Sequence, residues 1–328
     1  MYIADVYHDE LANLTLTRGF IYMLKNYLKI SSPWSQLGLF FGLLGGGLIL
    51  ASVLSVAILT AKGVATGHGN PDLSDPGLTG ALKLIQGLST VIIFAIPALL
   101  YARLTFREDP DYFLGFRKAE KNIFYLLAVA LLLFSFPVEG WLGQLNKGLP
   151  LAPWMIKMEE DADKQIDIFL RVSSPVDVYV NLFLIALLPA VCEEACFRGA
   201  LQRILIHAFK SPWAGIIVTG IFFSAFHMQF QGFLPRMFLG ILLGLIYWYS
   251  GSLWVSILAH FFYNGLQVAA ISFYPKLLHE NPSVPVYTAL ISLVIVVGLL
   301  SVMRRQSVTT YTRVYEPESG KEYDEFPS

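Results

Sequence analysis

Two adjacent glutamates and an arginine lie inside a long apolar part of the sequence. Glu193, Glu194 and Arg198 end an apolar run that begins near Val176. An ionisable side chain at membrane depth costs about 2.5–3.5 kcal/mol on insertion scales, so it is a functional-site hypothesis by default. Glu194 and Arg198 are four residues apart and can pair on one helix face, whereas Glu193 projects about 100° away. Glu193 is thus the carboxylate free for chemistry, although a purely structural buried salt bridge explains the other two residues as well.

Two histidines occur on other apolar segments, each with a partner one helical turn away. His227 follows Phe223 by four residues, and His260 precedes Asn264 by four. A lone histidine on an apolar helix is usually a core residue with satisfied hydrogen bonds. Two of them, each sharing a helix face with a second polar or aromatic side chain, are harder to explain by packing alone in a membrane.

The glutamates and His227 belong to neighbouring segments that are expected to form an antiparallel helical hairpin. Its turn lies near Lys210-Ser211-Pro212. Residues equidistant from such a turn lie at similar height, because both helices rise equally per residue. Glu193 lies 17 residues before Lys210 and His227 lies 17 residues after it. We therefore expect the carboxylate and the imidazole to face each other across the hairpin.

In order and in helix placement, these residues resemble the three motifs of the CPBP (Abi) family of intramembrane proteases. The motifs in this sequence are Glu193-Glu194-x-x-x-Arg198, Phe223-x-x-x-His227 and His260-x-x-x-Asn264. That family includes the type II CAAX prenyl endopeptidases and bacterial proteins linked to bacteriocin self-immunity. The resemblance covers roughly residues 120–275, and no motif position departs from the pattern.

The resemblance implies an intramembrane endopeptidase that acts on a peptide or membrane-protein substrate. By this resemblance Glu193 and His227 would activate a water molecule, and His260 and Asn264 would hold the oxyanion. The residue types agree, because hydrolysis without a Ser or Cys nucleophile needs an activated water, for which Glu and His can act as general base. Donors aimed at a developing oxyanion are typically worth ~2.7–4 kcal/mol each by mutation.

The resemblance further implies that Glu194 and Arg198 orient the site. It leaves open whether a metal takes part. No HExxH sequence occurs, so the chain is not a zincin. Glu193, His227 and His260 nevertheless form a set of side chains that zinc accepts, and a divalent metal such as zinc stays an open cofactor.

Two other classes of function compete with a protease. A noncatalytic membrane protein, such as a bacteriocin immunity-type factor or a scaffold, would retain the polar core for structure. A proton-coupled transporter would use Glu193 and His227 as a relay. Transport is the least favoured, because the sequence shows no internal repeat of the kind that inverted-topology carriers have.

The composition indicates an all-α, polytopic membrane protein. Of the 328 residues, 55% are hydrophobic and only 14% are charged, and the mean hydropathy is +0.58. Soluble domains contain about 25% charged residues. The formal net charge of −1 argues against nucleic acid as a partner. Cys192 and Cys196 are expected to be small buried apolar residues, and a metal-binding pair is the less favoured interpretation.

We expect a helical bundle of about eight transmembrane helices between two flanking segments. Residues 1–36 are expected to be an amphipathic interfacial segment, 37–303 the transmembrane domain, and 304–328 a polar, disordered cytoplasmic tail. The expected spans are 37–59, 81–101, 123–136, 178–207, 213–227, 233–249, 253–273 and 286–303. The third span is expected to end at Pro137, because proline removes a backbone N–H.

Residues 138–175 are expected to be a long connection that is too polar to cross the membrane. Within it, apolar residues recur at helical spacing opposite a run of acidic ones. The apolar positions are Met155, Met158, Ala162, Ile166 and Phe169. This pattern predicts an amphipathic helix lying on the membrane face, with a lid over the site as the sharper alternative.

Eight spans place both termini on the same side of the membrane. Basic residues gather before the first span and after the second, fourth and eighth, with the densest group at 103–121. Positively charged loops face the cytoplasm. We therefore expect a multi-pass protein of a bacterial inner (plasma) membrane with both termini in the cytoplasm.

Overall fold

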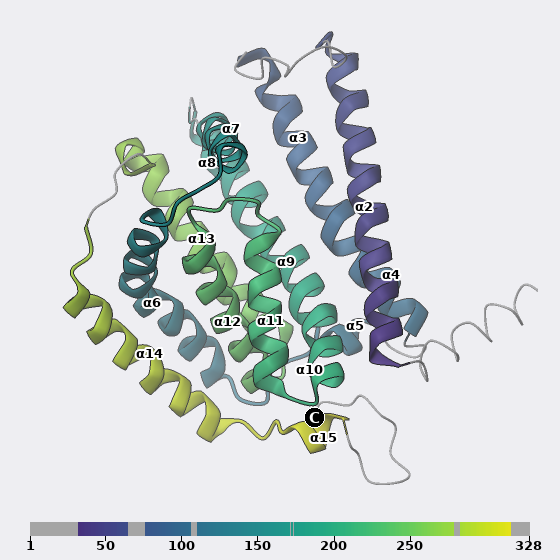
Figure 1. The fold of residues 1–328 in the computed structure, drawn as a ribbon, viewed down its shortest axis with the longest axis vertical. Coiled ribbons are helices and arrows are strands. Elements are labelled where there is room, and N and C mark those ends of the chain that lie inside the picture. The colour runs from purple at the N-terminus through teal and green to yellow at the C-terminus, as the bar shows by residue number, and fades with distance from the viewer. Residues whose placement is uncertain are drawn as a thin grey trace, which may run out of the picture.

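The computed structural model describes residues 32–64, 76–105, 110–170, 172, 174–278 and 283–315. These ranges form helices joined by short turns, and they contain no β-strand. The all-α bundle predicted from the composition is confirmed (Figure 1). The expected N-terminal amphipathic segment lies, up to residue 31, outside the described residues.

Seven helices are long and apolar enough to cross a membrane, counted over the described ranges. They are α2 (Pro33–Ala61), α3–η2–α4 (Thr79–Thr105), α6 (Ile123–Lys147), α8 to α10 (Pro175–Phe209), α12 (Phe233–Ser250), α13 (Leu253–Phe273) and α14 (Val286–Gln306). The expected fifth span is α11 (Pro212–Ala225), which has only 14 residues. A helix of that length rises about 21 Å, less than the roughly 30 Å of a bilayer core. The eight expected spans are thus seven long helices and one short helix.

The helix that carries the glutamate pair is interrupted twice by wider, π-helical turns. It consists of α8 (Pro175–Asn181), η3 (Leu182–Leu187), α9 (Leu188–Glu194), η4 (Ala195–Gln202) and α10 (Arg203–Phe209). The π-helical η3 ends just before Pro189, which cannot donate a backbone hydrogen bond, and η4 begins just after Glu194. Such turns are frequent at functional sites because they shift side chains around the helix axis.

Helix α6 continues through Pro137, so the expected end of the third span at this residue is wrong. A membrane helix tolerates a proline when neighbouring groups satisfy the freed carbonyls. The carbonyl freed here is that of Leu133, and serine hydroxyls bond to the carbonyls on either side of it, Ser135 to Leu132 and Ser292 to Phe134. The first ten residues of the expected 138–175 connection therefore belong to a spanning helix.

The start of the expected tail also differs from the prediction. Helix α14 extends to Gln306, and α15 (Tyr311–Tyr315) follows it. Val314 and Tyr315 are buried, and the Tyr315 hydroxyl donates to the carbonyl of Arg203 at 3.1 Å. The expected tail thus begins with helical residues, of which Val314 and Tyr315 pack against the bundle, and residues 316–328 lie outside the described residues.

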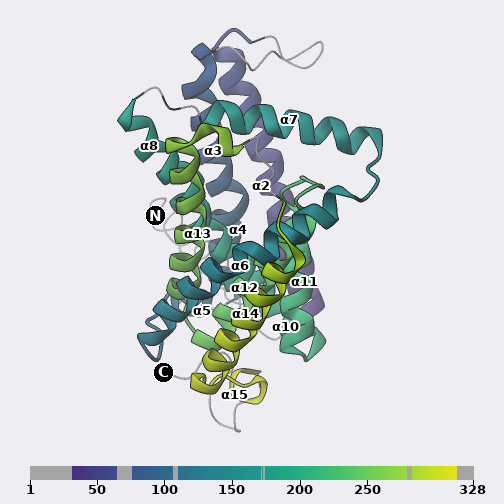
Figure 2. The same cartoon turned by 90° about the vertical axis from the view of Figure 1, so that its left-hand side faces the viewer.

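The amphipathic segment of the expected connection forms α7 (Pro153–Leu170), as the spacing of its apolar residues predicted. Figure 2 shows α7 lying across one end of the bundle, roughly perpendicular to the spanning helices. Further short helices are η1 (Pro76–Leu78), α5 (Pro110–Leu114) and η5 (Pro275–Leu278). Beneath α7, the central helices α6, α9, α12 and α13 pack against one another and position the site.

Candidate active site

A cavity of about 750 Å³ lies among the central helices and α7. It is lined by Glu193, His227, His260 and Asn264. These residues come from α9, from the turn after α11 and from α13. The structure therefore brings together the four residues expected to share a cavity, although their catalytic roles stay predictions.

Helical periodicity explains how α13 contributes to this cavity. Its lining residues recur every three or four positions: His260, Tyr263, Asn264, Gln267, Val268 and Ile271. Side chains at this spacing lie on one face of an α-helix. The motif pair His260 and Asn264 is therefore part of a longer stripe that faces the cavity.

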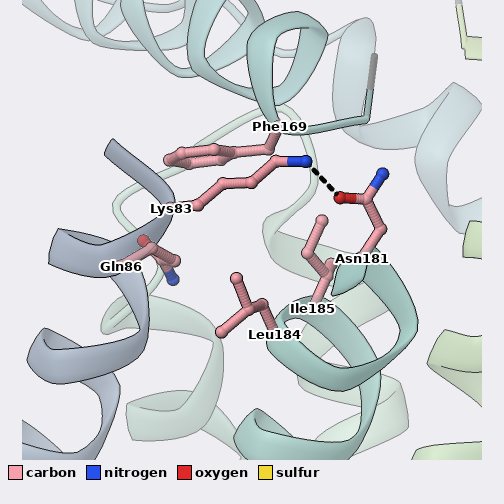
Figure 3. A pocket seen from close by; sticks show the side chains of 6 residues that line it. All are labelled: Lys83, Gln86, Phe169, Asn181, Leu184 and Ile185. Atoms are coloured by element: carbon pink, nitrogen blue, oxygen red, sulfur yellow. Dashed lines mark hydrogen bonds between the residues drawn. The ribbon is translucent and has the colours of Figure 1, made fainter. Parts of the chain in front are cut away.

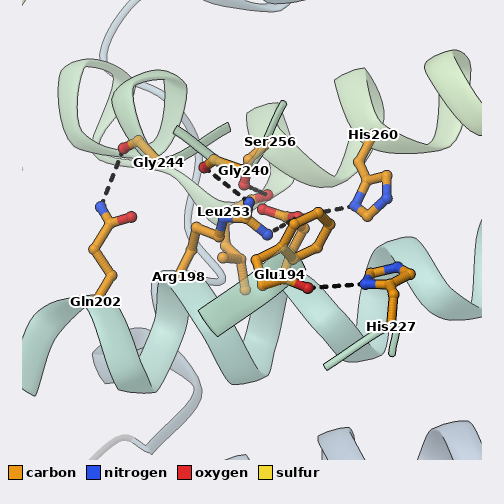
Figure 4. Close-up of polar contacts among 10 residues, drawn as sticks. Glu194, Arg198, Gln202, His227, Gly240, Gly244, Leu253, Ser256 and His260 are labelled. Atoms are coloured by element: carbon orange, nitrogen blue, oxygen red, sulfur yellow. Dashed lines mark hydrogen bonds and ion pairs between the residues drawn. The ribbon is translucent and has the colours of Figure 1, made fainter. Parts of the chain in front are cut away.

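Glu194 and Arg198 do not line the cavity but are fully buried behind it. Nη1 of Arg198 donates to Oε1 of Glu194 at 2.6 Å, which confirms the pair expected from their spacing. Nδ1 of His260 lies 2.9 Å from the same oxygen (Figure 4). Nη2 of Arg198 donates to the carbonyl of Gly240 at 3.0 Å. The Glu194 carboxylate and the Arg198 guanidinium thus join their own helix to α12 and α13.

Phe223 packs among the polar side chains of all three motifs. Cζ of Arg198 lies 4.5 Å from the centre of its ring. The rings of His227 and His260 lie edge-on to it at 5.1 Å and 5.9 Å between centroids. A buried guanidinium over an aromatic face gains an attraction of ~2 kcal/mol or more when desolvated. The phenylalanine therefore holds the ion pair and both imidazoles in place.

The hydrogen bond at His227 defines which of its nitrogens is available. Nδ1 lies 2.8 Å from the backbone carbonyl of Phe223. A carbonyl only accepts, so Nδ1 carries the hydrogen, and in the neutral ring Nε2 has the lone pair. The residue sits in the turn 226–232 between α11 and α12. Irregular backbone at membrane depth is tolerated where it lines a cavity, as this turn does.

The glycines of α12 allow close contact with α11 at Gly240 and with the helix that carries the glutamates at Gly244. A Cβ at Gly240 would lie 3.0 Å from Cα of Gly220, and a Cβ at Gly244 would lie 2.6 Å from Oε1 of Gln202. The carbonyl of Gly244 accepts from Nε2 of Gln202 at 3.1 Å, one turn from the Gly240–Arg198 bond. The small residues at this spacing therefore form a packing face.

The side chains present do not form a metal-ligand set in this arrangement. Among the residues the structure describes, no group of three or more His, Cys, Asp and Glu side chains is close enough to hold a metal ion. Glu193, His227 and His260 share the cavity, and Nδ1 of each histidine bonds to a carbonyl or a carboxylate, which leaves Nε2 as the nitrogen that could meet a ligand. Cys192 and Cys196 are buried, as expected.

Several polar residues of the cavity, among them Glu139, Tyr263 and Arg236, have no counterpart in the sequence predictions. Glu139 and Tyr263 line it and are hydrogen-bonded to each other, and Arg236 lines it from α12. Glu139 was expected in the polar connection, whereas it lies in α6. The available signal was an acidic residue two positions after a proline, directly following an apolar run.

Helix α7 forms one wall of the cavity through residues such as Ile166 and Phe169. It also contacts the turn that carries His227: Glu159 accepts from the backbone N–H of Gln231 at 2.9 Å, and Trp154 meets Phe230 edge-on at 5.3 Å. This contact of α7 with the cavity favours the second interpretation of the segment, a lid over the site.

A small hollow adjoins the cavity beneath α7 (Figure 3). Nζ of Lys83 donates to Oδ1 of Asn181 at 2.8 Å, which joins α3 (Thr79–Thr90) to α8. Phe169 lies over the lysine, and it lines both the hollow and the cavity. The hollow is too small to hold a water molecule, so the Lys83–Asn181 pair is part of the packing under α7.

Residues 175–266 match the model of the family described as type II CAAX prenyl endopeptidase Rce1-like. The matched segment begins with α8 and ends two residues after Asn264, so it contains all three motifs. The resemblance inferred from the motifs is confirmed for this segment. The chain is a multi-pass integral membrane protein, and its segment 175–266 is similar to the type II CAAX prenyl endopeptidases.

A curated relative is the "Uncharacterized 24.3 kDa protein" of Escherichia coli, 32% identical over 120 residues. The alignment covers 34% of this chain and 48% of that protein, so the chain spans about half the length of this relative. No solved structure matches the chain.

Proposed function

We propose that the chain is an intramembrane endopeptidase, similar to the type II CAAX prenyl endopeptidases, that hydrolyses a peptide bond with a glutamate-activated water. The observation that carries this proposal is the division of the motif residues into two groups. Glu193, His227, His260 and Asn264 line one cavity, whereas Glu194 and Arg198 lie behind it. The first group can meet a substrate, and the second can only support the first.

Water activation is assigned to Glu193 and His227. Glu193 lines the cavity with 8% of its surface exposed, and Nε2 of His227 is the nitrogen left without a backbone bond. The carboxylate accepts a proton from water, and the water oxygen attacks the carbonyl carbon of the scissile bond. General-base catalysis of this kind contributes typically ~10²–10⁴-fold.

Oxyanion stabilisation is assigned to His260 and Asn264. Both lie on the face of α13 that lines the cavity. The bond from Nδ1 of His260 to Glu194 fixes the ring, and Nε2 then donates to the oxyanion in the imidazolium form, in which both ring nitrogens carry a hydrogen. The Asn264 amide can donate to the carbonyl oxygen as it becomes negative.

Collapse of the tetrahedral intermediate completes the reaction. The carbon–nitrogen bond breaks, and the proton taken from water passes from Glu193 or His227 to the leaving nitrogen. The products are a new carboxyl terminus and a free amine. Every atom and proton is supplied by the peptide, one water and these side chains, so no metal is needed to balance the step.

The test compares the wild type with Glu193→Gln, which keeps the shape of the side chain but removes the base. Purified proteins are assayed in detergent with membrane-derived peptides, and membrane peptides from cells expressing each form are compared by mass spectrometry. We expect turnover to fall ~10²–10⁴-fold at an unchanged melting temperature.

The matched control is Glu160→Gln, an exposed carboxylate on α7. It should cleave like the wild type. Normal cleavage by Glu193→Gln would refute the assignment of the base. Identical membrane peptide profiles for wild type and variant, with no cleavage in detergent, would favour a noncatalytic protein.

A further inference from the structure

Helix α13 is held in the bundle by two buried carboxylates from different helices. Nδ1 of His260 lies 2.9 Å from Oε1 of Glu194. Three residues further along α13, the hydroxyl of Tyr263 donates to Oε2 of Glu139, and Oε1 of Glu139 lies 2.5 Å from the hydroxyl oxygen of Ser135. Only 5% of Glu139 and 9% of Tyr263 are exposed. Neither of these two residues belongs to the three motifs.

The ring of Tyr263 is fixed by α6 in a second way. Phe136 stacks on it with the ring centroids 4.7 Å apart and the planes 11° from parallel. Phe136 and Glu139 are three residues apart and so lie on the same face of α6. One turn of α6 therefore determines both the position of the tyrosine ring and the direction of its hydroxyl.

We propose that Glu139 is a positioning residue, which sets the rotation of α13 through Tyr263 and thereby directs His260 and Asn264 into the cavity. Tyr263 follows His260 by three residues and immediately precedes Asn264, so the three side chains rotate together on about one helical turn. This inference rests on the proposed function, in which those two residues hold the oxyanion. A displacement of 1 Å at a reacting centre can cost ~10²-fold in rate.

Glu139 could instead be a subsite for a cationic group of the substrate, or it could have a merely structural role, and the three roles need different chemistry. A cation subsite needs the negative charge. A positioning role needs only hydrogen bonds to Ser135 and Tyr263, which a glutamine can also form through its amide oxygen and nitrogen. A merely structural role predicts lost stability without a selective effect on turnover.

The experiment uses the full chain with three variants: Tyr263→Phe, Glu139→Met and Glu139→Gln. The first keeps the stacked ring and removes the hydroxyl, and the second removes both hydrogen bonds. We expect both to lower kcat by about 10- to 100-fold while KM stays within about threefold, because ground-state contacts persist. Glu139→Gln, which can form both hydrogen bonds, should keep kcat within about threefold of the wild type.

Tyr247→Phe is the matched control. Tyr247 is fully buried in α12, and its hydroxyl donates to the carbonyl of Leu114 at 3.2 Å, remote from the cavity lining. It should lose thermal stability like Tyr263→Phe but keep its kcat. Wild-type kcat in Tyr263→Phe, or an equal loss of kcat in Tyr247→Phe, would overturn the proposal. A selective rise in KM for Glu139→Gln would overturn it in favour of a cation subsite.

A second measurement does not depend on hydrolysis. Asn264→Cys provides a thiol in the cavity wall, and the native Cys192 and Cys196 are buried. If Glu139 positions α13, adding Tyr263→Phe should change the rate at which this thiol reacts with a maleimide by more than about threefold, and adding Tyr247→Phe should not. An unchanged rate would overturn the positioning role even if the wild type proved to cleave nothing.

Discussion

Oε1 of Glu194 lies 2.9 Å from Nδ1 of His260, although the two residues are 66 positions apart in the chain. The same oxygen accepts from Arg198, so the second glutamate of the pair joins the first and third motifs. Its carboxylate is engaged on the side away from the cavity. The adjacent Glu193, about 100° further around the helix, is left facing the cavity.

The first prediction concerns Glu194→Gln. This change leaves Arg198 buried with its ionic partner removed, and it weakens the bond to His260. Breaking a buried pair by removing one member costs ~3–5 kcal/mol, so the melting temperature should fall strongly, and activity with it. Differential scanning fluorimetry and peptide cleavage, measured in parallel, check this.

Its control is the double change Glu194→Gln with Arg198→Gln. Removing both charges relieves the unpaired guanidinium, so part of the lost stability should return. If Glu194→Gln is as stable as the wild type and yet inactive, Glu194 rather than Glu193 is the reacting carboxylate.

The second prediction concerns the packing of α12. Gly240→Ala would place a Cβ 3.0 Å from Cα of Gly220 and 3.1 Å from the Phe223 ring. Overpacking of this kind typically costs 1–3 kcal/mol, about as much as a lost buried contact. The measurement is thermal unfolding in detergent. Gly298→Ala, where no atom lies within 4 Å of the added Cβ, should be neutral, and equal stability of the two variants would contradict the close helix contact.

The third prediction is that hydrolysis survives removal of divalent metals. Among the described residues, Glu193, His227 and His260 included, no group of three or more His, Cys, Asp and Glu side chains is close enough to hold a metal ion. Purified protein is treated with a chelator, its metal content is measured, and peptide cleavage is assayed. Activity should stay within about twofold, since the base is a side chain. Loss of activity that added zinc restores would refute a metal-independent mechanism.

Periodicity and motif spacing predicted the parts of the structure that depend on a single helix or on one helical hairpin. The Glu194–Arg198 pair, the amphipathic α7 and the convergence of the hairpin residues on one cavity follow from rise and angle per residue. Contacts between helices distant in sequence, such as Glu194 with His260, have no local signal. The position of Glu139 differs from the prediction because Pro137, two residues earlier, does not end the helix: α6 continues through it, with serine hydroxyls bonded to the carbonyls of Leu132 and Phe134.

The last prediction is the orientation of the chain in the membrane. Its basic residues gather at one end of the bundle, where the loops also contact one another. Nζ of Lys121 donates to Gln306 at 2.9 Å, and Nε of Arg117 donates to the carbonyl of Gly251 at 2.7 Å. Because basic loops are retained in the cytoplasm, this end should face inward.

Single cysteines at two exposed positions test this orientation. Lys118 lies between α5 and α6 at the basic end, and Lys62 follows α2 at the opposite end. The native Cys192 and Cys196 are buried and should contribute little background. In intact cells a membrane-impermeant maleimide should label Lys62→Cys but not Lys118→Cys, and both should react after permeabilisation. Labelling of Lys118→Cys alone in intact cells would invert the topology, and the end of the bundle covered by α7 would then face the cytoplasm.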